Sequence, residues 1–258
     1  MTDTLVRAEL AGGVATITLD SPHNRNALSS ALVTQFLSAL ADAQADPACR
    51  VIVLSHTGDV FCSGADLKEA AAVTSSGGAV SAGGLGDLLT AIWESPKPVV
   101  ARVAGKARAG GLGLIAAADI AVGLAEATFA FSEVRLGVVP AVISATVLPR
   151  LTPRAATELF LTGDSFTGAR AVEIGLLTAA VPVAELDQTV ARYVASLLRG
   201  GPAALAATKR LVAQGRTYAP TPDRLAELAA LSAEFFGSAE AHEGLLAFLE
   251  KRAPNWVP

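Results

Sequence analysis

Two glycine-bearing turns in the sequence have residue types and spacing that suit the stabilisation of a developing negative charge. The first runs Phe61-Cys62-Ser63-Gly64-Ala65-Asp66-Leu67 after a predicted buried strand at Val51–Leu54, and the second spans Gly105–Gly113 after a strand that ends at Val103. A turn between a strand and a helix leaves backbone N–H groups without acceptors, and these groups favour negative charge. Two such turns side by side would point two N–H groups at one oxygen, as an oxyanion hole requires. Glycines at such junctions also satisfy turn geometry alone, and spacing by itself leaves that interpretation open.

Other signatures of catalysis are missing from the sequence. No G-x-G-x-x-G follows the first strand, and Gly105-Lys106-Ala107 lacks the upstream glycine and the Ser or Thr of a phosphate-binding loop. Nucleotide-dependent redox chemistry and phosphoryl transfer are therefore disfavoured. No G-x-S-x-G turn occurs, and the histidines stand singly in predicted loops or on a polar helix end, at His23, His56 and His242. A serine triad and a zinc site are disfavoured as well.

Strand and helix patterns alternate through the first half of the chain. Apolar or β-branched runs predict strands at Val14–Leu19, Val51–Leu54, Pro98–Val103 and Ile120–Val122. A helix that begins at Asn26 is indicated by apolar residues on one face, namely Leu28, Leu32, Phe36 and Leu40. This alternation predicts an α/β core with mainly parallel strands.

Beyond Pro149 the pattern becomes helical. Helices bounded by Pro or Gly are predicted at Ala155–Leu161, Ala169–Leu176, Ala184–Leu198, Pro202–Ala213, Arg224–Phe236 and Ala239–Lys251. Upstream, the small residues of Ala70–Gly86 predict a mobile segment, either a lid or a surface loop without a role. The uncharged stretch Leu136–Pro149 is expected to lie in the core, because Pro140, Ser144 and Thr146 interrupt it.

Composition and charge exclude several classes of protein. With 258 residues, of which 52% are hydrophobic and 17% charged, the chain can bury its own core and is neither disordered nor a coiled coil. A net charge of −4 offers no positive field to nucleic acid. No apolar run reaches the roughly 18 residues of a membrane span, and the N-terminus predicts no signal peptide. Because Cys49 and Cys62 cannot form a disulfide framework, a reducing, cytoplasmic compartment is expected.

Five short blocks of the sequence resemble the crotonase superfamily of enoyl-CoA hydratases and isomerases. They are Arg25-Asn26-Ala27-Leu28, Phe61–Leu67, Gly105–Gly113 continued by Ala118-Asp119-Ile120, Phe131–Pro140 and Phe248–Trp256. Each block alone is a weak signal. Their order from residue 25 to residue 256 makes the resemblance specific.

The resemblance implies an α/β fold, a crotonase-like spiral of ββα units with a C-terminal helical region. Residues 1–195 would form the spiral core, and residues 196–258 would form helices that serve oligomerisation or cap the active site. The implied partner is an acyl-CoA thioester, with coenzyme A carried as part of the substrate and no cofactor or metal besides it. No nucleic acid or membrane partner is expected. The implied assembly is a homotrimer or homohexamer.

The resemblance also assigns site residues by position. The backbone N–H groups of Ala65 and Gly110 would hold the thioester oxygen as it becomes an enolate. Residues expected to contact the substrate or its CoA are Arg25, Ala27, Ser63, Ala65, Asp66, Leu67, Lys68 and Gly110.

Glu133 and Gly113 stand where hydratases of this superfamily carry two glutamates that position and split a water, so this chain keeps one carboxylate of the two. Apolar neighbours predict partial burial of Glu133 and a raised pKa, which suits a proton carrier; these neighbours are Phe129, Phe131, Val134 and Leu136. A solvent-facing glutamate at a helix start is the alternative interpretation.

Gly113 costs a helix about 1 kcal/mol relative to alanine. We therefore expect that space is needed there and that the volume left by the missing side chain accommodates a branched or bulky acyl group. The other walls of the pocket are expected from the Ala70–Gly86 segment and from Val139, Val142 and Ile143.

These residues favour an enoyl-CoA hydratase that adds water across a 2,3-double bond, with Glu133 as acid and base. An enoyl-CoA isomerase, or another enolate-forming member such as a thioester hydrolase or a C–C lyase, is the main alternative. A member that binds CoA thioesters or partner subunits with little catalysis is the third hypothesis.

Overall fold

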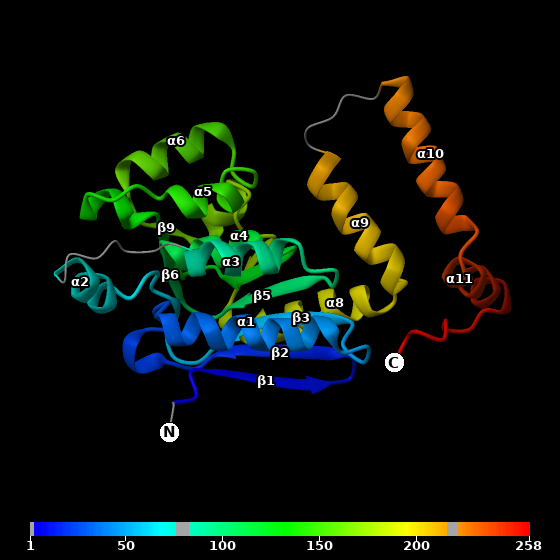
Figure 1. The fold of residues 1–258 in the computed structure, drawn as a ribbon, viewed down its shortest axis with the longest axis horizontal. Helices are drawn as coiled ribbons and strands as arrows, with labels where there is room; N and C mark the ends of the chain where they lie inside the picture. The colour runs from blue at the N-terminus through cyan, green and yellow to red at the C-terminus, as the bar shows by residue number, and fades with distance from the viewer. Residues whose placement is uncertain (1–2, 76–82, 216–220) are drawn as a thin grey trace.

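The strands of the chain form two sheets in the part that the computed structural model describes, residues 3–75, 83–215 and 221–258 (Figure 1). The larger sheet has the order β1-β2-β3-β5-β7-β10, and the smaller has the order β4-β6-β8-β9. The larger sheet contains β1 (Val6–Ala11), β2 (Val14–Leu19), β3 (Val51–His56), β5 (Val99–Val103), β7 (Ile120–Leu124) and β10 (Ala179–Val181). The smaller contains β4 (Val60–Cys62), β6 (Lys106–Arg108), β8 (Thr128–Ala130) and β9 (Phe166–Thr167).

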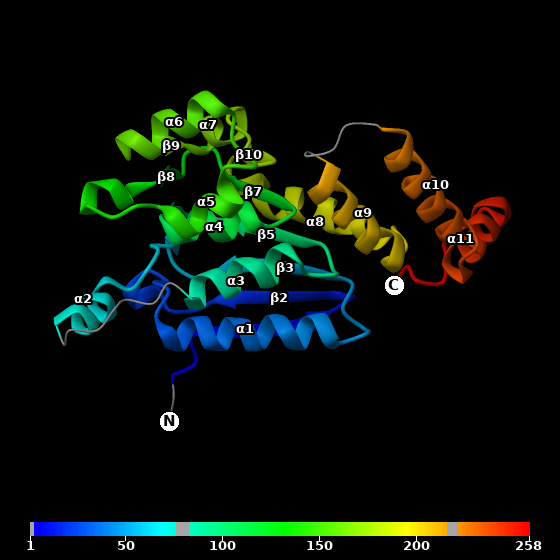
Figure 2. The same ribbon diagram turned by 45° about the horizontal axis from the view of Figure 1, so that its top comes forward.

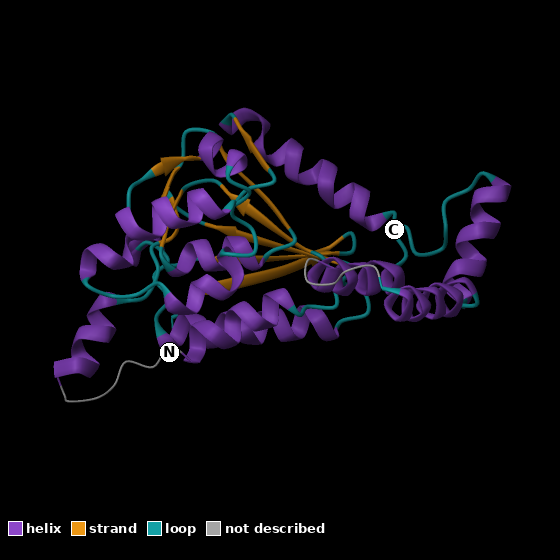
Figure 3. Cartoon of the chain, turned by 90° about the horizontal axis from the view of Figure 1, so that it is seen from above, coloured by secondary structure: helices purple, strands orange, loops and turns teal. Residues whose placement is uncertain are grey.

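The larger sheet is covered on both faces, because successive side chains of a strand point to opposite sides. In β3, Val51 and Val53 pack in one apolar cluster with residues of α8 (Leu186–Leu198). Ile52 and Leu54 belong to the other cluster, which contains side chains of α1 (Ser30–Ala45) and α3 (Gly83–Trp93). Figure 3 shows the strands lying between helices on either side. A strand buried on both faces needs a continuous apolar run, which is why β3 was recognisable in the sequence.

The chain winds as a spiral in which a strand of the larger sheet leads to a short strand of the smaller sheet and then to a helix. Thus β3 leads to β4 and α2 (Leu67–Ser75), and β5 leads to β6 and α4 (Gly110–Ala117). β7 leads to β8, a short 3₁₀ turn at Ser132–Leu136 and α5 (Ala141–Val147). β4 pairs with β6, and β6 with β8, in parallel. This arrangement confirms the α/β spiral of ββα units, and it places the carboxyl ends of β4, β6 and β8 at one edge.

The C-terminal part of the chain is helical, as predicted. It contains α6 (Pro153–Thr162), α7 (Gly168–Glu173), α8, α9 (Pro202–Gly215), α10 (Pro222–Phe236) and α11 (Ala239–Glu250). In Figures 1 and 2, α10 and α11 lie at the end of the molecule opposite α2. Within one copy of the chain they therefore do not cover the turn that precedes α2. No helix in the described ranges is both long and apolar enough to cross a bilayer.

The start of one predicted helix and part of a predicted mobile segment differ in the structure. α1 begins at Ser30 rather than Asn26, because the Ser29 side chain accepts the N–H of Leu32 and Leu28 forms a parallel β-bridge with Ala65. Much of the stretch expected to be mobile, Ala70–Gly86, belongs to the end of α2 and the start of α3. Its centre, residues 76–82, lies outside the described residues, and so does the lid expected there.

The prediction that Leu136–Pro149 is core was wrong in part. The segment forms the 3₁₀ turn and α5, and α5 buries Ile143, Thr146 and Val147. Four other apolar residues of the stretch are exposed, namely Leu136, Val138, Val139 and Leu148. None of these four lies within α5: Leu136 ends the 3₁₀ turn, Val138 and Val139 lie between that turn and α5, and Leu148 follows the last residue of α5.

His56 at the end of β3 is buried, whereas the sequence predicted a loop position. Its Nε2 accepts the Ala104 N–H at 3.0 Å, and its Nδ1 lies 3.3 Å from the Thr57 carbonyl oxygen. The ring meets Phe61 edge to face, with centroids 5.4 Å apart. These contacts join two successive units of the spiral. Burial lowers the pKa of His56, and the charge of Arg102 lowers it further.

We expect the free energy of unfolding to decrease as the pH falls below 6.5, the ordinary pKa of histidine. In that range the unfolded chain binds a proton at His56 while the folded chain does not, so the stabilisation is complete above pH 6.5 and is lost as the pH falls through the lower pKa of the folded state. His56→Gln keeps a side-chain acceptor but does not titrate. Urea unfolding from about pH 8 to pH 5 should show a weaker pH dependence for this variant than for the wild type. If the free energy of unfolding depends on pH equally in His56→Gln and in the wild type, His56 does not cause the loss of stability at low pH.

Candidate active site

Three segments of the chain meet where β4, β6 and β8 end. Ser63–Asp66 follows β4, Ala109 and Gly110 follow β6, and Phe131–Glu133 follows β8. Neighbouring strands lie roughly 4.8 Å apart, so residues that directly follow paired strands lie close to one another. The Ala109 N–H donates to the Ala130 carbonyl at 3.2 Å, which extends the β6–β8 pairing into the site. The topology thus brings together the three segments that contain Ala65, Gly110 and Glu133.

The turns after β4 and β6 touch each other through glycine. A Cβ built on Gly64, whose φ is +90°, would lie 2.8 Å from the Ala109 Cβ and 3.2 Å from the Gly110 nitrogen. A Cβ on Gly111 would lie 2.6 Å from the Cys62 carbonyl oxygen. Real Cβ atoms do not approach backbone atoms so closely. The first and second glycine-bearing turns therefore pack backbone against backbone, which only glycine allows.

The packing leaves two backbone donors at this contact. The Gly64 carbonyl accepts the Leu28 N–H at 2.8 Å, and because a trans peptide unit holds C=O and N–H on opposite sides, the Ala65 N–H points away from Leu28. Gly110 is the first residue of α4, where N–H groups have no acceptor within the helix. Within the described residues, neither N–H donates to a protein acceptor. The site therefore offers two backbone donors to a ligand oxygen.

Ala109 holds a strained backbone conformation beside these donors. Its φ of 48° and ψ of −120° lie in a region that residues other than glycine rarely adopt. Such strain persists only where the surrounding structure imposes it, and it clusters at functional sites. Here the strained residue stands at the turn from β6 into α4, directly before the Gly110 N–H. Nothing in the sequence marked Ala109, apart from the two glycines that follow it.

Asn26 fixes the N-terminal loop against the site, a role that the sequence did not assign to it. Its fully buried amide accepts the Ser21 N–H at 2.8 Å and donates to the carbonyls of Thr57 at 3.0 Å and Val60 at 2.8 Å. The adjacent Arg25 carbonyl accepts the Ser63 N–H at 3.1 Å. The loop therefore supports the β4 turn from its outer side.

Glu133 is partly buried in the 3₁₀ turn after β8, as predicted. Its Oε2 is fully buried and has no hydrogen-bond partner among the described residues. Burial raises the pKa of Glu133, and its own backbone N–H offsets only part of that rise. An unpartnered buried acceptor costs free energy in the empty protein, of the order of 1–3 kcal/mol or more. A proton or a ligand hydrogen at Oε2 would remove that cost.

The residues expected to contact CoA surround Ala65 but do not share one environment. Arg25, Leu67 and Lys68 are exposed, Ser63 and Asp66 are half-buried, and Ala27 is buried. Asp66 also has a structural role, since its Oδ1 accepts the N–H groups of Lys68 at 3.0 Å and Glu69 at 3.2 Å at the start of α2. The structure therefore explains Asp66 without a ligand.

Gly113 is buried in α4, and the space beside it is filled by protein. A Cβ built there would lie 2.8 Å from Ile143 Cγ2 and 3.3 Å from Leu89 Cδ2. The expectation that the missing side chain leaves open volume for an acyl group is therefore wrong at this point. Ile143 from α5 and Leu89 from α3 occupy that volume. The sequence could not show this, because both contacts connect distant segments.

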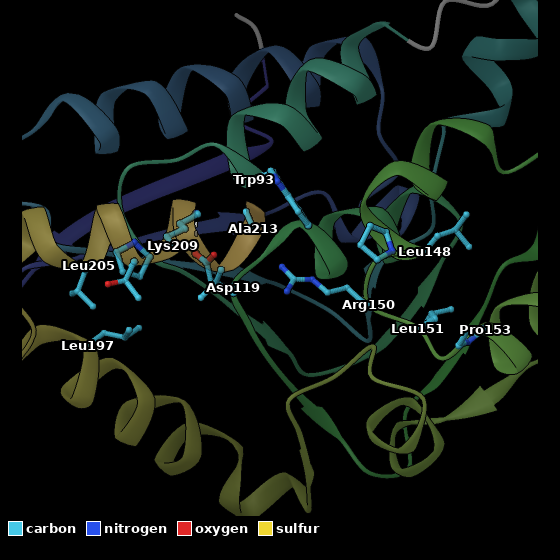
Figure 4. A pocket seen from close by; sticks show the side chains of 14 residues that line it. Trp93, Asp119, Leu148, Arg150, Leu151, Pro153, Leu197, Leu205, Lys209 and Ala213 are labelled. Carbon is cyan, nitrogen blue, oxygen red and sulfur yellow. Dashed lines mark ion pairs between the residues drawn. The ribbon is translucent and has the colours of Figure 1, made fainter. Parts of the chain in front are cut away.

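A cleft of about 660 Å³ lies away from these segments, beside α9 (Figure 4). Apolar side chains line most of it, and it also contains the ion pair between Lys209 Nζ and Asp119 Oδ2, 2.9 Å apart. Asp119 also accepts the Val99 N–H at 2.8 Å, so it connects α9 to the sheet. Ala65, Gly110 and Glu133 are not among the residues that line this cleft.

Comparison with known proteins finds relatives over nearly the whole chain. The family model described as enoyl-CoA hydratase/isomerase matches residues 9–257. An enoyl-CoA hydratase of solved structure from Mycobacterium avium is 48% identical, with a TM-score of 0.74, and the match covers 99% of this chain and 100% of that one. An enoyl-CoA hydratase from Shewanella pealeana is 30% identical with a TM-score of 0.91, over 98% and 96% of the two chains. A Rhodobacter capsulatus protein named "Probable enoyl-CoA hydratase" is 36% identical over 98% of this chain and 97% of its own length.

Removing the Gly110 N–H should lower turnover of a thioester substrate by about 10²-fold or more, the usual effect of losing one oxyanion donor. Gly110→Pro deletes this N–H at the first position of a helix, where proline is tolerated. Gly110→Ala keeps the N–H, and its Cβ first meets the flexible end of the Leu28 side chain at 2.9 Å. The two variants are compared by kcat after circular dichroism has shown that both fold. Equal turnover by the proline and alanine variants would show that this N–H holds no reacting oxygen.

Proposed function

The chain belongs to the enoyl-CoA hydratase/isomerase family, and from that premise we propose that it adds water across the 2,3-double bond of an enoyl-CoA thioester. Coenzyme A enters as part of the substrate, and no other cofactor is needed. The observation that carries the proposal is the buried Glu133 Oε2, which has no hydrogen-bond partner among the described residues. Glu133 follows β8, the strand that pairs with β6, and the Gly110 turn follows β6. A protein that only bound thioesters would have no use for such a carboxylate.

The proposed reaction uses Glu133 twice. Its carboxylate removes a proton from water, and the resulting hydroxide forms a bond to C3 of the enoyl group. The electron pair of the double bond moves to the thioester oxygen, where the Ala65 and Gly110 N–H groups stabilise the enolate. The protonated Glu133 then delivers its proton to C2, which restores the thioester carbonyl and the carboxylate. One water is added and no other group is consumed.

An enoyl-CoA isomerase is the second candidate, and the packing at Gly113 favours it. At that position Ile143 and Leu89 fill the space, so this part of α4 presents an apolar surface. A single carboxylate suffices to take a proton from one carbon of the substrate and return it to another. Incubation with crotonyl-CoA in H₂¹⁸O separates the two functions, because only hydration places the label in the product.

Glu133→Gln should lower kcat by roughly 10²- to 10⁴-fold with little change in the binding of the CoA thioester, because it keeps the shape but removes the acid and base. The matched control is Glu126→Gln, an exposed glutamate in the same region. In the wild type, kcat should fall as the pH drops through the raised pKa of Glu133, since the carboxylate form accepts the proton from water. If Glu133→Gln turns over nearly as fast as Glu126→Gln, Glu133 is not the acid and base of the reaction.

We also propose that the chain works as a homotrimer or as a homohexamer. Four apolar side chains of α11 are exposed, namely Leu245, Leu246, Phe248 and Leu249, and Phe248 is 80% exposed. An apolar cluster of this kind on a monomer marks an interaction surface. Closed symmetric assemblies of identical subunits are the usual way to cover it.

Sedimentation velocity at micromolar concentration should show a trimer or a multiple of it, and Phe248→Asp together with Leu249→Asp should shift the chain to the monomer. Leu10→Asp, at an exposed leucine of β1, serves as the control and should leave the assembly intact. A wild-type monomer at this concentration would contradict the proposed assembly.

The proposed compartment is the reducing cytoplasm. Cys49 and Cys62 are both buried free thiols. Burial raises the pKa of Cys62 to about 12, which keeps this thiol protonated and unreactive. Neither cysteine takes part in the proposed reaction.

A further inference from the structure

Side chains contact one face of helix α4 from Gly110, whose N–H is the proposed oxyanion donor, to Gly113, where the contact is made by Ile143. Gly110 and Gly113 stand three residues apart, so they share one face of the helix and differ by about 4.5 Å along its axis. On α3, Leu85 Cδ2 would lie 3.5 Å from a Cβ on Gly110, and Leu89 Cδ2 would lie 3.3 Å from a Cβ on Gly113. Leu85 and Leu89, one helical turn apart on α3, therefore lie along the same face of α4. We call this contact of Leu85 and Leu89 with Gly110 and Gly113 the seam.

Ile143 of α5 lies at the Gly113 end of this seam and closes it. Its Cγ2 and Cβ would lie 2.8 Å and 3.2 Å from a Cβ on Gly113, and its side chain is 2% exposed. Thr146, on the same helix, donates from its hydroxyl to the Gly113 carbonyl at 3.1 Å. The hydrogen bond and the apolar contact together hold α5 against α4 at this turn.

A groove lies on the other side of this closure, between α3 and α5. It has a volume of about 460 Å³ and is lined by Leu89, Thr90, Trp93, Val142, Ala145 and Thr146 among others. Two of these residues, Leu89 and Thr146, contact Gly113 or its carbonyl. Leu89 thus belongs to both the groove and the seam, and Ile143, which contacts the Gly113 position, directly follows Val142 of the groove lining in the chain.

We propose that Ile143, with Leu89, sets the chain-length limit for the acyl group, and that the α3–α5 groove is an acyl channel which these two side chains keep closed. The inference rests on the proposed function only in that the ligand is an acyl-CoA thioester. An acyl tail that starts at the Gly110 N–H and follows the seam meets Ile143 within one helical turn. The wild-type site therefore accepts short acyl groups. Shortening Ile143 joins the seam to a groove that is lined mainly by apolar side chains, with Glu94 and two threonines also in the lining, and that can bury several more methylenes.

The test measures equilibrium binding of saturated acyl-CoAs by calorimetry, which requires no turnover. The ligands are butyryl-CoA, octanoyl-CoA and dodecanoyl-CoA. For the wild type, the longer chains should bind no more tightly than butyryl-CoA. In Ile143→Ala, octanoyl-CoA should gain at least about 10-fold in affinity over butyryl-CoA, since each methylene moved from water into an apolar channel is worth roughly 4-fold.

Leu89→Ala shortens the other side chain of the closure and should show the same gain, which keeps the test decisive if Ile143→Ala fails to fold. The matched control is Val147→Ala, a buried residue one turn further along α5, whose chain-length profile should match that of the wild type. If affinity depends on acyl-chain length in Ile143→Ala and in Leu89→Ala just as it does in the wild type, the inference is overturned while the proposed function stands. A wild type that already prefers octanoyl-CoA 10-fold would also overturn it. Failure of the wild type to bind any of the three acyl-CoAs would overturn the proposed function together with the inference.

Discussion

The contact between the Gly64 turn and the start of α4 is the constraint on which the rest of the site depends. With no side chain at Gly64 or Gly111, two strand-to-helix turns approach until the backbone of one meets the backbone of the other. Any larger residue would collide with a backbone atom or the Ala109 Cβ, and would separate the turns by at least the width of a methyl group. The Ala65 and Gly110 N–H groups would then lie further apart. The parallel pairing of β4 with β6, and the strained backbone of Ala109, both serve this approach.

The same contact determines the electrostatic character of the site. Backbone donors at a helix N-terminus stabilise negative charge without adding a titratable group. The titratable group nearby is Glu133, whose pKa is raised by burial; Phe129 in β8 and Phe131 directly after it are fully buried. The two backbone N–H groups and the Glu133 carboxylate therefore follow neighbouring strands of one small sheet. This arrangement suits the proposed reaction, in which an enolate forms on the thioester oxygen while Glu133 holds a proton.

The sequence alone predicted the elements whose pattern is local. Val14–Leu19, the buried run at Val51–Leu54 and the helices beyond Pro149 appear in the structure close to their predicted limits. The sequence pattern did not predict the short strands β4, β6, β8 and β9, because segments of two or three residues show no periodicity. They were expected only through the family resemblance, although they bring the site segments together.

The contacts that shape the site were harder to predict, since they join segments distant in sequence. Asn26 was noticed as part of a motif, but its three hydrogen bonds to Ser21, Thr57 and Val60 depend on the folded chain. Gly113 was recognised as a departure, yet its consequence was predicted wrongly because Ile143 and Leu89 fill the space. Burial of His56 was missed for the same reason, since its partner Ala104 lies in another unit of the spiral.

The central claim is that the Ala65 and Gly110 N–H groups polarise the carbonyl of a bound thioester. Isotope-edited infrared difference spectroscopy tests it directly, with a ¹³C label at the carbonyl carbon of a bound acyl-CoA. Two hydrogen bonds from fixed backbone donors should move the carbonyl stretch to a lower frequency than that of the same thioester in buffer. A stretch at the frequency of the free thioester would contradict the account.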